Sequence, residues 1–197
     1  MTQRSGFGWN PFLTWLLANI LGFGSLGIVL LVFPSLISKS GLLGSVLIIS
    51  IPVSFAQWIA LRRFFPISIF WIFTIPLGLL AAIQMMEFLP NSIWDYVNGE
   101  ALSTLFVSYL IIGFIISLPQ WIILRRYCDK ASLWILGASL GAALGMGVIF
   151  GTDIINQSGV ISFILAFLLY AVTTGLILAW LLVNVNQSQT PVTSIPE

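Results

Sequence analysis

The sequence predicts an all-α integral membrane protein with six transmembrane helices, arranged as three tandem helical hairpins. Only 7% of its 197 residues are charged and 59% are hydrophobic, whereas a soluble domain carries about 25% charged residues. Six uncharged apolar stretches follow one another along the chain, and part of the sequence repeats itself. We expect a single membrane domain over residues 1–186 and a flexible polar tail over residues 187–197.

Six stretches are long enough to cross a bilayer, because about 20 helical residues at about 1.5 Å each span the hydrocarbon. The predicted spans are residues 11–33, 42–61, 67–86, 103–124, 133–150 and 160–183. Every charged residue lies outside them, as expected when a charge at the bilayer centre costs at least ~2.5 kcal/mol. Pro52, Pro76 and Pro119 lie inside predicted spans and are expected to bend them.

The distribution of cations predicts that both termini are cytoplasmic, since cytoplasmic loops carry an excess of Lys and Arg. The predicted cytoplasmic side holds Arg4, Arg62, Arg63, Arg125, Arg126 and Lys130, whereas the opposite side holds only Lys39. The acids Glu87, Asp95, Glu100 and Asp153 fall on that opposite side.

An internal repeat is the most informative feature of the sequence. Residues 54–78 align without gaps to residues 117–141, and 11 of the 25 positions are identical. The shared core reads Gln-Trp-Ile-x-Leu-Arg-Arg, beginning at Gln57 in one copy and at Gln120 in the other. Apolar composition does not explain the matching Gln-Trp and Arg-Arg pairs, so the repeat predicts a duplicated structural unit.

A second pattern, Trp-x5-Leu-Gly, begins at Trp15, Trp71 and Trp134. A less complete third copy of the first pattern contains Trp180, with Asn184 in place of the first arginine. The chain therefore divides into hairpins over about residues 11–63, 67–126 and 133–185. Because each hairpin holds two spans, all three share one orientation, which predicts approximate threefold symmetry about the membrane normal.

Small residues and tryptophans follow the same repeat. Gly137, Gly141 and Gly145 lie four residues apart, a spacing that favours close packing of membrane helices, with a solute path as the alternative. Seven of the eight tryptophans map to the predicted cytoplasmic side. We expect them to form an aromatic belt at the headgroup level, and a tryptophan-lined vestibule is the alternative.

Two glutamines are the leading candidates for a ligand-binding site. Gln57 and Gln120 each lie near the end of a span and directly precede Trp58 and Trp121. A side-chain amide at that depth needs partners, which could be the other glutamine, a backbone carbonyl, water or a ligand. Hydrogen bonding between helices is the structural interpretation. The functional interpretation turns both amides and the adjacent tryptophans toward a ligand on the bundle axis.

The arginine pairs that follow these tryptophans are expected to set the topology and to contact anionic headgroups. They are Arg62, Arg63, Arg125 and Arg126. Binding of an anionic solute or of a cytoplasmic protein partner is the alternative.

The composition also excludes several activities. Without histidine the chain has no imidazole base or imidazole metal ligand, and a single cysteine, Cys128, forms no metal cluster. A net charge of +1 gives no footprint for nucleic acid. We therefore expect no catalytic residue, no metal, no cofactor and no enzymatic activity.

The repeated Gln-Trp-Ile-x-Leu-Arg-Arg element, each copy followed by a Trp-x5-Leu-Gly helix, resembles an uncharacterised family of small multipass membrane proteins in bacteria, cyanobacteria among them. That resemblance implies a six-span repeat protein in a bacterial plasma membrane or a thylakoid membrane, and it implies no activity. The expected function is binding or transport of a small solute or lipid. The alternative is a non-catalytic structural or accessory subunit that contacts a membrane-protein partner.

Overall fold

The structure is a computed structural model that describes residues 9–33, 35, 39–88, 102–153 and 159–188. Within these ranges the chain is helical and contains no strand, so the all-α prediction is confirmed. The elements are α1 (Trp9–Val32), α3 (Gly41–Leu61), η1 (Ile69–Phe73), α4 (Thr74–Phe88), α6 (Leu102–Leu124), α7 (Ser132–Asp153) and α8 (Gly159–Ser188). Helix α8 covers the first residues of the predicted tail, and the tail from residue 189 lies outside the described residues.

Five of the described helices are long and apolar enough to cross a membrane. They contain the candidate spans Trp9–Val29, Gly41–Leu61, Phe106–Leu124, Ser132–Ile149 and Ile161–Asn184. The sixth apolar segment, Ile69–Met85, combines η1 with most of α4 and is shorter, at 17 residues. This helix content fits a multipass integral membrane protein.

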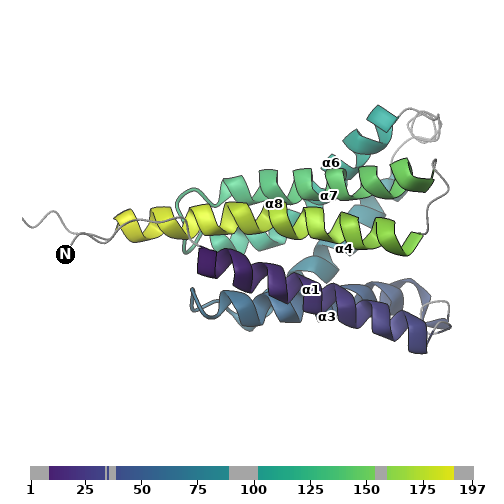
Figure 1. The fold of residues 1–197 in the computed structure, drawn as a ribbon, viewed down its shortest axis with the longest axis horizontal. Helices are drawn as coiled ribbons and strands as arrows, with labels where there is room; N and C mark the ends of the chain where they lie inside the picture. Colours follow the sequence, from purple (N-terminus) through teal and green to yellow (C-terminus); the bar gives the residue numbers. More distant parts are fainter. Residues whose placement is uncertain (1–8, 34, 36–38, 89–101, 154–158, 189–197) are drawn as a thin grey trace, which may run out of the picture.

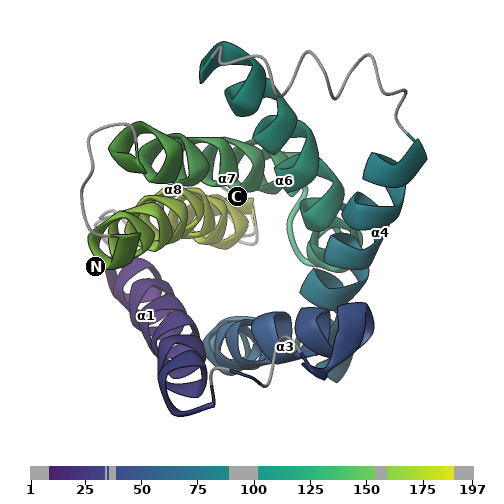
Figure 2. The same ribbon diagram turned by 90° about the vertical axis from the view of Figure 1, so that its right-hand side faces the viewer.

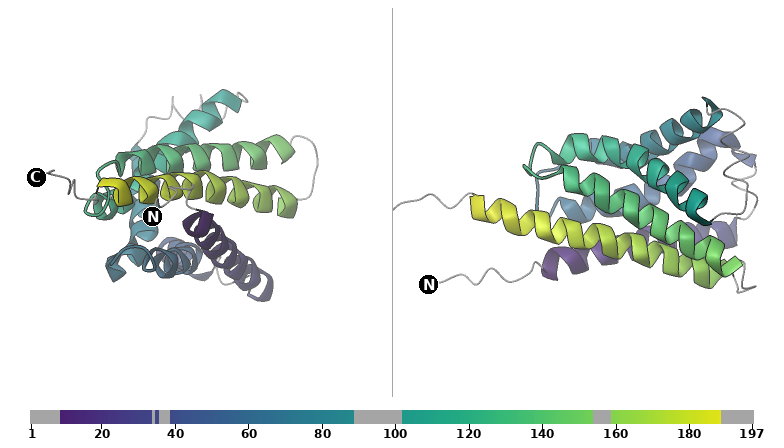
Figure 3. Two further views of the ribbon diagram at one scale, coloured as in Figure 1. Left: turned by 60° about the vertical axis from the view of Figure 1, so that its left-hand side comes forward. Right: turned by 90° about the horizontal axis from the view of Figure 1, so that it is seen from above.

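The helices form a closed ring in chain order. Each helix packs against its neighbour in the sequence, from α1 through α3, α4, α6 and α7 to α8, and α8 packs against α1. Figure 2 shows α1, α3, α4, α6, α7 and α8 around a common centre, and Figure 3 shows α7 and α8 side by side along most of their length. This arrangement brings one side of every helix to the middle of the ring.

One end of the ring holds the start of α1, the turns after α3 and α6, and the end of α8 (Figure 1). We call it the arginine end, because the two turns carry Arg62 and Arg125. The turns are tied together, since the Tyr127 hydroxyl donates a hydrogen bond of 2.9 Å to the Pro66 carbonyl. The predicted acids of the opposite side, Glu87, Asp95, Glu100 and Asp153, have no described side-chain positions.

Glycines set the distance between the two helices of each hairpin. A Cβ atom at Gly22 would lie 2.8 Å from the Cα of Val53, and one at Gly78 would lie 2.5 Å from the Cα of Ile116. A Cβ atom at Gly141, at the equivalent position of the repeat, would meet the Thr173 hydroxyl and would lie 3.2 Å from the Cα of Tyr170, both on α8. A side chain would therefore push the helices apart, which confirms the packing role predicted for the small residues.

Two of the three prolines lie inside a helix as predicted, and one lies at the start of a helix. Pro52 and Pro119 lie inside α3 and α6, as predicted. Pro76, however, lies in the first turn of α4, which begins at Thr74 after the 3-10 turn η1. A proline is tolerated there because the first N–H groups of a helix have no acceptor within it. The third predicted span thus changes helix type where the sequence suggested a bend.

Candidate functional site

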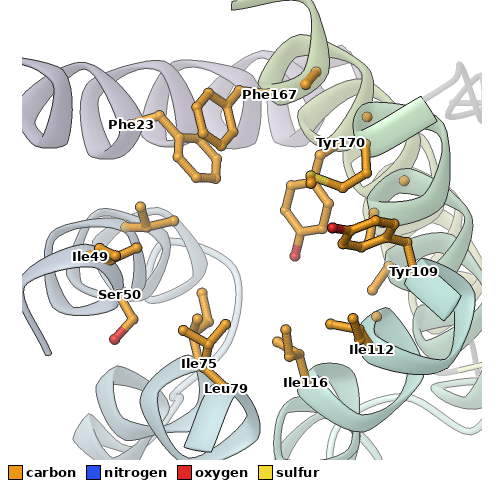
Figure 4. Close-up of a pocket in the computed structure, with 18 of the residues that line it drawn as sticks. Phe23, Ile49, Ser50, Ile75, Leu79, Tyr109, Ile112, Ile116, Phe167 and Tyr170 are labelled. Atoms are coloured by element: carbon orange, nitrogen blue, oxygen red, sulfur yellow. The ribbon is translucent and has the colours of Figure 1, made fainter. Parts of the chain in front are cut away.

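A cavity of about 310 Å³ lies at the centre of the ring (Figure 4). Each of the described helices α1, α3, α4, α6, α7 and α8 contributes at least one residue to its wall. One lining residue from each helix, in that order, is Phe23, Val53, Ile75, Ile116, Ala138 and Tyr170. An apolar cavity of about 150 Å³ takes a benzene molecule, so this one has room for a molecule about twice as large.

The cavity wall is apolar apart from a few hydroxyl groups. Ser50 contributes one hydroxyl, which donates to the Val46 carbonyl at 2.5 Å. The hydroxyls of Tyr109 and Tyr170 turn toward the open centre (Figure 4). The described residues that line the cavity include none with a charge. A wall of this kind suits an uncharged, largely apolar molecule.

A layer of buried polar side chains lies next to the cavity. Each of the six wall residues named above has a polar side chain four residues along its own helical segment, toward the arginine end. These side chains form what we call the polar layer: Asn19, Gln57, Trp71, Gln120, Trp134 and Thr174. All six are 0% exposed. Because four helical residues rise by about 6 Å, the layer lies about one helical turn beyond the lining of the cavity, which includes none of these six side chains.

Hydrogen bonds within the polar layer join neighbouring helices. Nε1 of Trp134 donates to Oε1 of Gln120 at 2.9 Å, which connects α7 to α6. Nε2 of Gln57 donates to Oδ1 of Asn19, also at 2.9 Å, which connects α3 to α1. The two glutamines therefore occupy equivalent positions of the repeat but form hydrogen bonds with different residues.

Thr174 completes the layer on the α8 side. Its hydroxyl accepts a hydrogen bond of 2.9 Å from Nε1 of Trp15, which connects α1 to α8. Asn19 in turn donates to the Trp15 carbonyl at 2.9 Å. The Gln57 side chain also lies close enough to the Tyr170 hydroxyl to interact with it, so the layer is in contact with the cavity wall.

Several polar atoms of this region are buried without a hydrogen-bond partner among the described residues. They are Oε1 of Gln57, Nε1 of Trp71, Nε2 of Gln120 and the hydroxyl of Ser54, one turn from Gln57 on the same helix. Leaving such a group unpaired costs about 1–3 kcal/mol. The polar layer thus retains both donors and acceptors that could bind another molecule.

Three tryptophans pack together where the layer meets the main hydrophobic core. The ring centroids of Trp15 and Trp134 are 5.2 Å apart, those of Trp71 and Trp134 are 6.1 Å apart, and both pairs meet edge to face. All three side chains are 0% exposed. The predicted aromatic belt is therefore wrong for these three, because the interior of the ring buries them. Leu61 and Leu124 join the same core.

Trp58 and Trp121, the other two candidate ligand-binding residues, lie at the outer edge of that core. The guanidinium carbon of Arg62 is 4.7 Å from the ring centroid of Trp58, and that of Arg125 is 5.2 Å from Trp121. Both are cation–π contacts between residues one helical turn apart. The described lining of the cavity includes neither these tryptophans nor Gln57 and Gln120.

The third copy of the repeat obtains its cation from another part of the chain. Asn184 stands where Arg62 and Arg125 stand in the other copies, but Nζ of Lys130 lies 5.2 Å from the ring centroid of Trp180. Arg63 and Arg126 are the other two arginines that were predicted to contact lipid headgroups, and both are exposed. All three copies therefore place a cation over the same tryptophan position.

Asn19, Thr174 and the cavity-facing Tyr170 were not identified from the sequence. Asn19 and Thr174 are polar residues inside apolar spans, a signal comparable to that of the two glutamines. Neither lies in the part of the chain where the repeat is most regular, so the comparison of copies did not single them out.

Replacing Gln120 with leucine is expected to destabilise the protein by about 1–3 kcal/mol, because the buried Trp134 N–H would lose its acceptor. Trp134→Phe removes that donor, so combining the two substitutions should cost less than the sum of the single variants. A double-mutant cycle of unfolding in detergent mixtures measures the difference. Gln84→Leu, at an exposed position of α4, serves as the control. Strict additivity would contradict the importance of this hydrogen bond.

The described residues include no group of three or more metal-ligating side chains placed to hold a metal ion. In comparisons with protein-family models, curated proteins and solved structures, no match to the chain is found.

Proposed function

We propose that this multipass membrane protein binds a small lipophilic molecule in its central cavity. The observation that carries the proposal is the cavity of about 310 Å³, to which all six helices contribute. Its volume falls at the lower end of the range for small-molecule sites, about 300–1,000 Å³. A hydrocarbon-like wall with a few hydroxyls favours a ligand taken from the bilayer over an ion taken from water.

The proposal extends to the topology. The segment Ile69–Met85 would be a sixth, short span, and three hairpins of one orientation would surround the ligand with approximate threefold symmetry. Support comes from the equivalent glycines at the helix crossings and from the cation over Trp58, Trp121 and Trp180. The arginine end would face the cytoplasm of a bacterium, in contact with anionic headgroups.

Single introduced cysteines test this topology. The only native cysteine, Cys128, is buried, and burial together with neighbouring Asp129 raises the pKa of its thiol to about 11. Because a higher pKa lowers the thiolate fraction, Cys128 is expected to react about a hundredfold more slowly at pH 7 than a thiol of ordinary pKa. Maleimide should then label Arg63→Cys and Arg126→Cys from one side of intact vesicles and Lys39→Cys from the other. Labelling of Arg63→Cys and Arg126→Cys from opposite sides would refute the proposed topology.

The binding proposal is tested by gentle extraction followed by native mass spectrometry. We expect the wild-type protein to retain a small molecule that Leu79→Trp loses, because Leu79 lines the cavity and an indole there would fill much of it. Leu77→Trp is the matched control, since Leu77 lies on the same helix but is 58% exposed. The control should retain the ligand.

Other results would count against binding. Retention of the same molecule by both tryptophan variants would place it outside the cavity. If the wild type retains no small molecule and no lipophilic compound stabilises it, the binding proposal fails. With either of these results, retention of a second protein would favour the alternative function, an accessory subunit of a larger membrane complex.

A further inference from the structure

We infer that the cavity takes an amphipathic molecule whose uncharged head group both donates and accepts hydrogen bonds, as an alcohol or a primary amide does. The apolar part would fill the cavity, and the head would extend about one helical turn past its lining to reach the polar layer, whose side chains have no exposed surface in this structure. This inference rests on the proposed binding function and specifies its ligand class.

The position of the polar layer gives the ligand a direction. The wall of the cavity is apolar at Val53, Ile75 and Ile116, yet one helical turn toward the arginine end the same segments carry Gln57, Trp71 and Gln120. A purely apolar ligand would leave the unpaired polar atoms of these side chains without hydrogen bonds. A ligand with a polar head at this end would provide hydrogen bonds that the protein does not make by itself.

The unpartnered atoms of the layer are both donors and acceptors. Oε1 of Gln57 can only accept, whereas Nε1 of Trp71 and Nε2 of Gln120 can only donate. In the other copy of the repeat the equivalent indole and glutamine, Trp134 and Gln120, are hydrogen-bonded to each other at 2.9 Å. Between α3 and η1, which are in contact, Oε1 of Gln57 and Nε1 of Trp71 have no hydrogen-bond partner, while Nε2 of Gln57 donates to Asn19. A head group with one donor and one acceptor can serve both.

The electrostatic environment selects against a charged head. All the side chains of the polar layer are uncharged and 0% exposed. The described cations Arg62 and Arg125 lie over Trp58 and Trp121 at the edge of the core. A carboxylate or an ammonium group would therefore lose its hydration without gaining an opposite charge, which costs several kcal/mol.

Three eight-carbon probes test the inference: octanamide, octane and octanoate. Equilibrium binding of labelled probes to the full chain in nanodiscs is measured at pH 7, and the uptake by protein-free nanodiscs is subtracted. We expect octanamide to bind at least about tenfold more tightly than octane and octanoate. In Gln57→Leu the preference for octanamide over octane should fall to about one, while octane binding persists. The exposed Gln84→Leu variant should keep the wild-type preference.

Ser54→Ala gives a second test that does not depend on the stability of the Gln57 variant. The Ser54 hydroxyl is buried without a partner, which costs stability, so its removal should not lower the unfolding midpoint. Octanamide binding should nevertheless weaken several-fold, and octane binding should stay the same. An unchanged preference for octanamide in both Ser54→Ala and Gln57→Leu would overturn the role of the polar layer.

The outcomes separate the inference from the function on which it rests. Equal binding of octane and octanamide by the wild type would overturn the inference. Water molecules would then be the hydrogen-bond partners of the unpaired atoms in the polar layer. Tightest binding of octanoate would overturn it as well. Saturable binding of octane in either case would still support an apolar binding cavity, whereas no saturable binding of any probe would count against the binding proposal itself.

Discussion

Trp134→Ala is expected to lower the free energy of unfolding by about 3–5 kcal/mol, one of the largest effects of any single substitution in this protein. The Trp134 side chain is 0% exposed, meets Trp15 and Trp71 edge to face, and donates to Gln120. Truncation would leave a void at the junction of three helical segments and would also leave the Gln120 oxygen unpaired. Both losses occur inside the ring, where lipid cannot fill the space.

Reversible unfolding in mixtures of mild and denaturing detergents measures this effect. Trp9→Ala is the control, because Trp9 is 63% exposed and its removal creates no internal void. We expect the control to change the free energy of unfolding by less than about 1 kcal/mol. Similar losses in the two variants would show that the tryptophan cluster does not hold the arginine end together.

The second large effect is expected for Gly78→Val, which should separate α4 from α6. A Cβ atom at Gly78 would already lie 2.5 Å from the Ile116 Cα and 2.8 Å from its carbonyl oxygen. These are backbone atoms, so no rotamer change relieves the clash, and we expect a loss of about 3 kcal/mol, at the upper end of the usual cost of overpacking. Because Ile116 also lines the cavity, the variant should lose ligand binding together with stability.

Gly24→Val is the matched control for this prediction. A Cβ at Gly24 meets no atom within 4 Å, so valine there should change the unfolding midpoint by only a few degrees. Thermal unfolding followed in detergent distinguishes the two variants. If Gly78→Val were as stable as Gly24→Val and still bound its ligand, the close crossing of α4 and α6 would not be needed.

The helical content and the helix crossings could be predicted from the sequence because they depend on local and periodic features. Apolar stretches without charge predict helices, since backbone groups in lipid must be paired within the segment. The spacing of small residues predicted close packing at Gly141, and Gly22 and Gly78, the other glycines of the Trp-x5-Leu-Gly pattern, lie at close helix contacts as well. The exception is η1, where Pro76 begins a new helix instead of bending one.

The site was less predictable because it depends on which helix faces which. Gln57 and Gln120 were identified as buried amides in need of partners, and both are 0% exposed. Their identical sequence surroundings give no reason for Gln57 to bind Asn19 while Gln120 binds Trp134. That difference arises because Gln57 faces an asparagine on α1, and no equivalent of Asn19 exists in the other copies.

The sequence by itself determined that the helices suit a lipid environment, how much of the chain is helical, and where helices come close together. These properties depend on hydropathy and on the spacing of small residues, which act locally along each segment. Only the tertiary structure decided that the helices close into a ring, that six separate polar residues meet in one layer, and that a cavity remains beside it. Packing around a common centre depends on the shapes of side chains from all six helices at once, and no single segment carries that information.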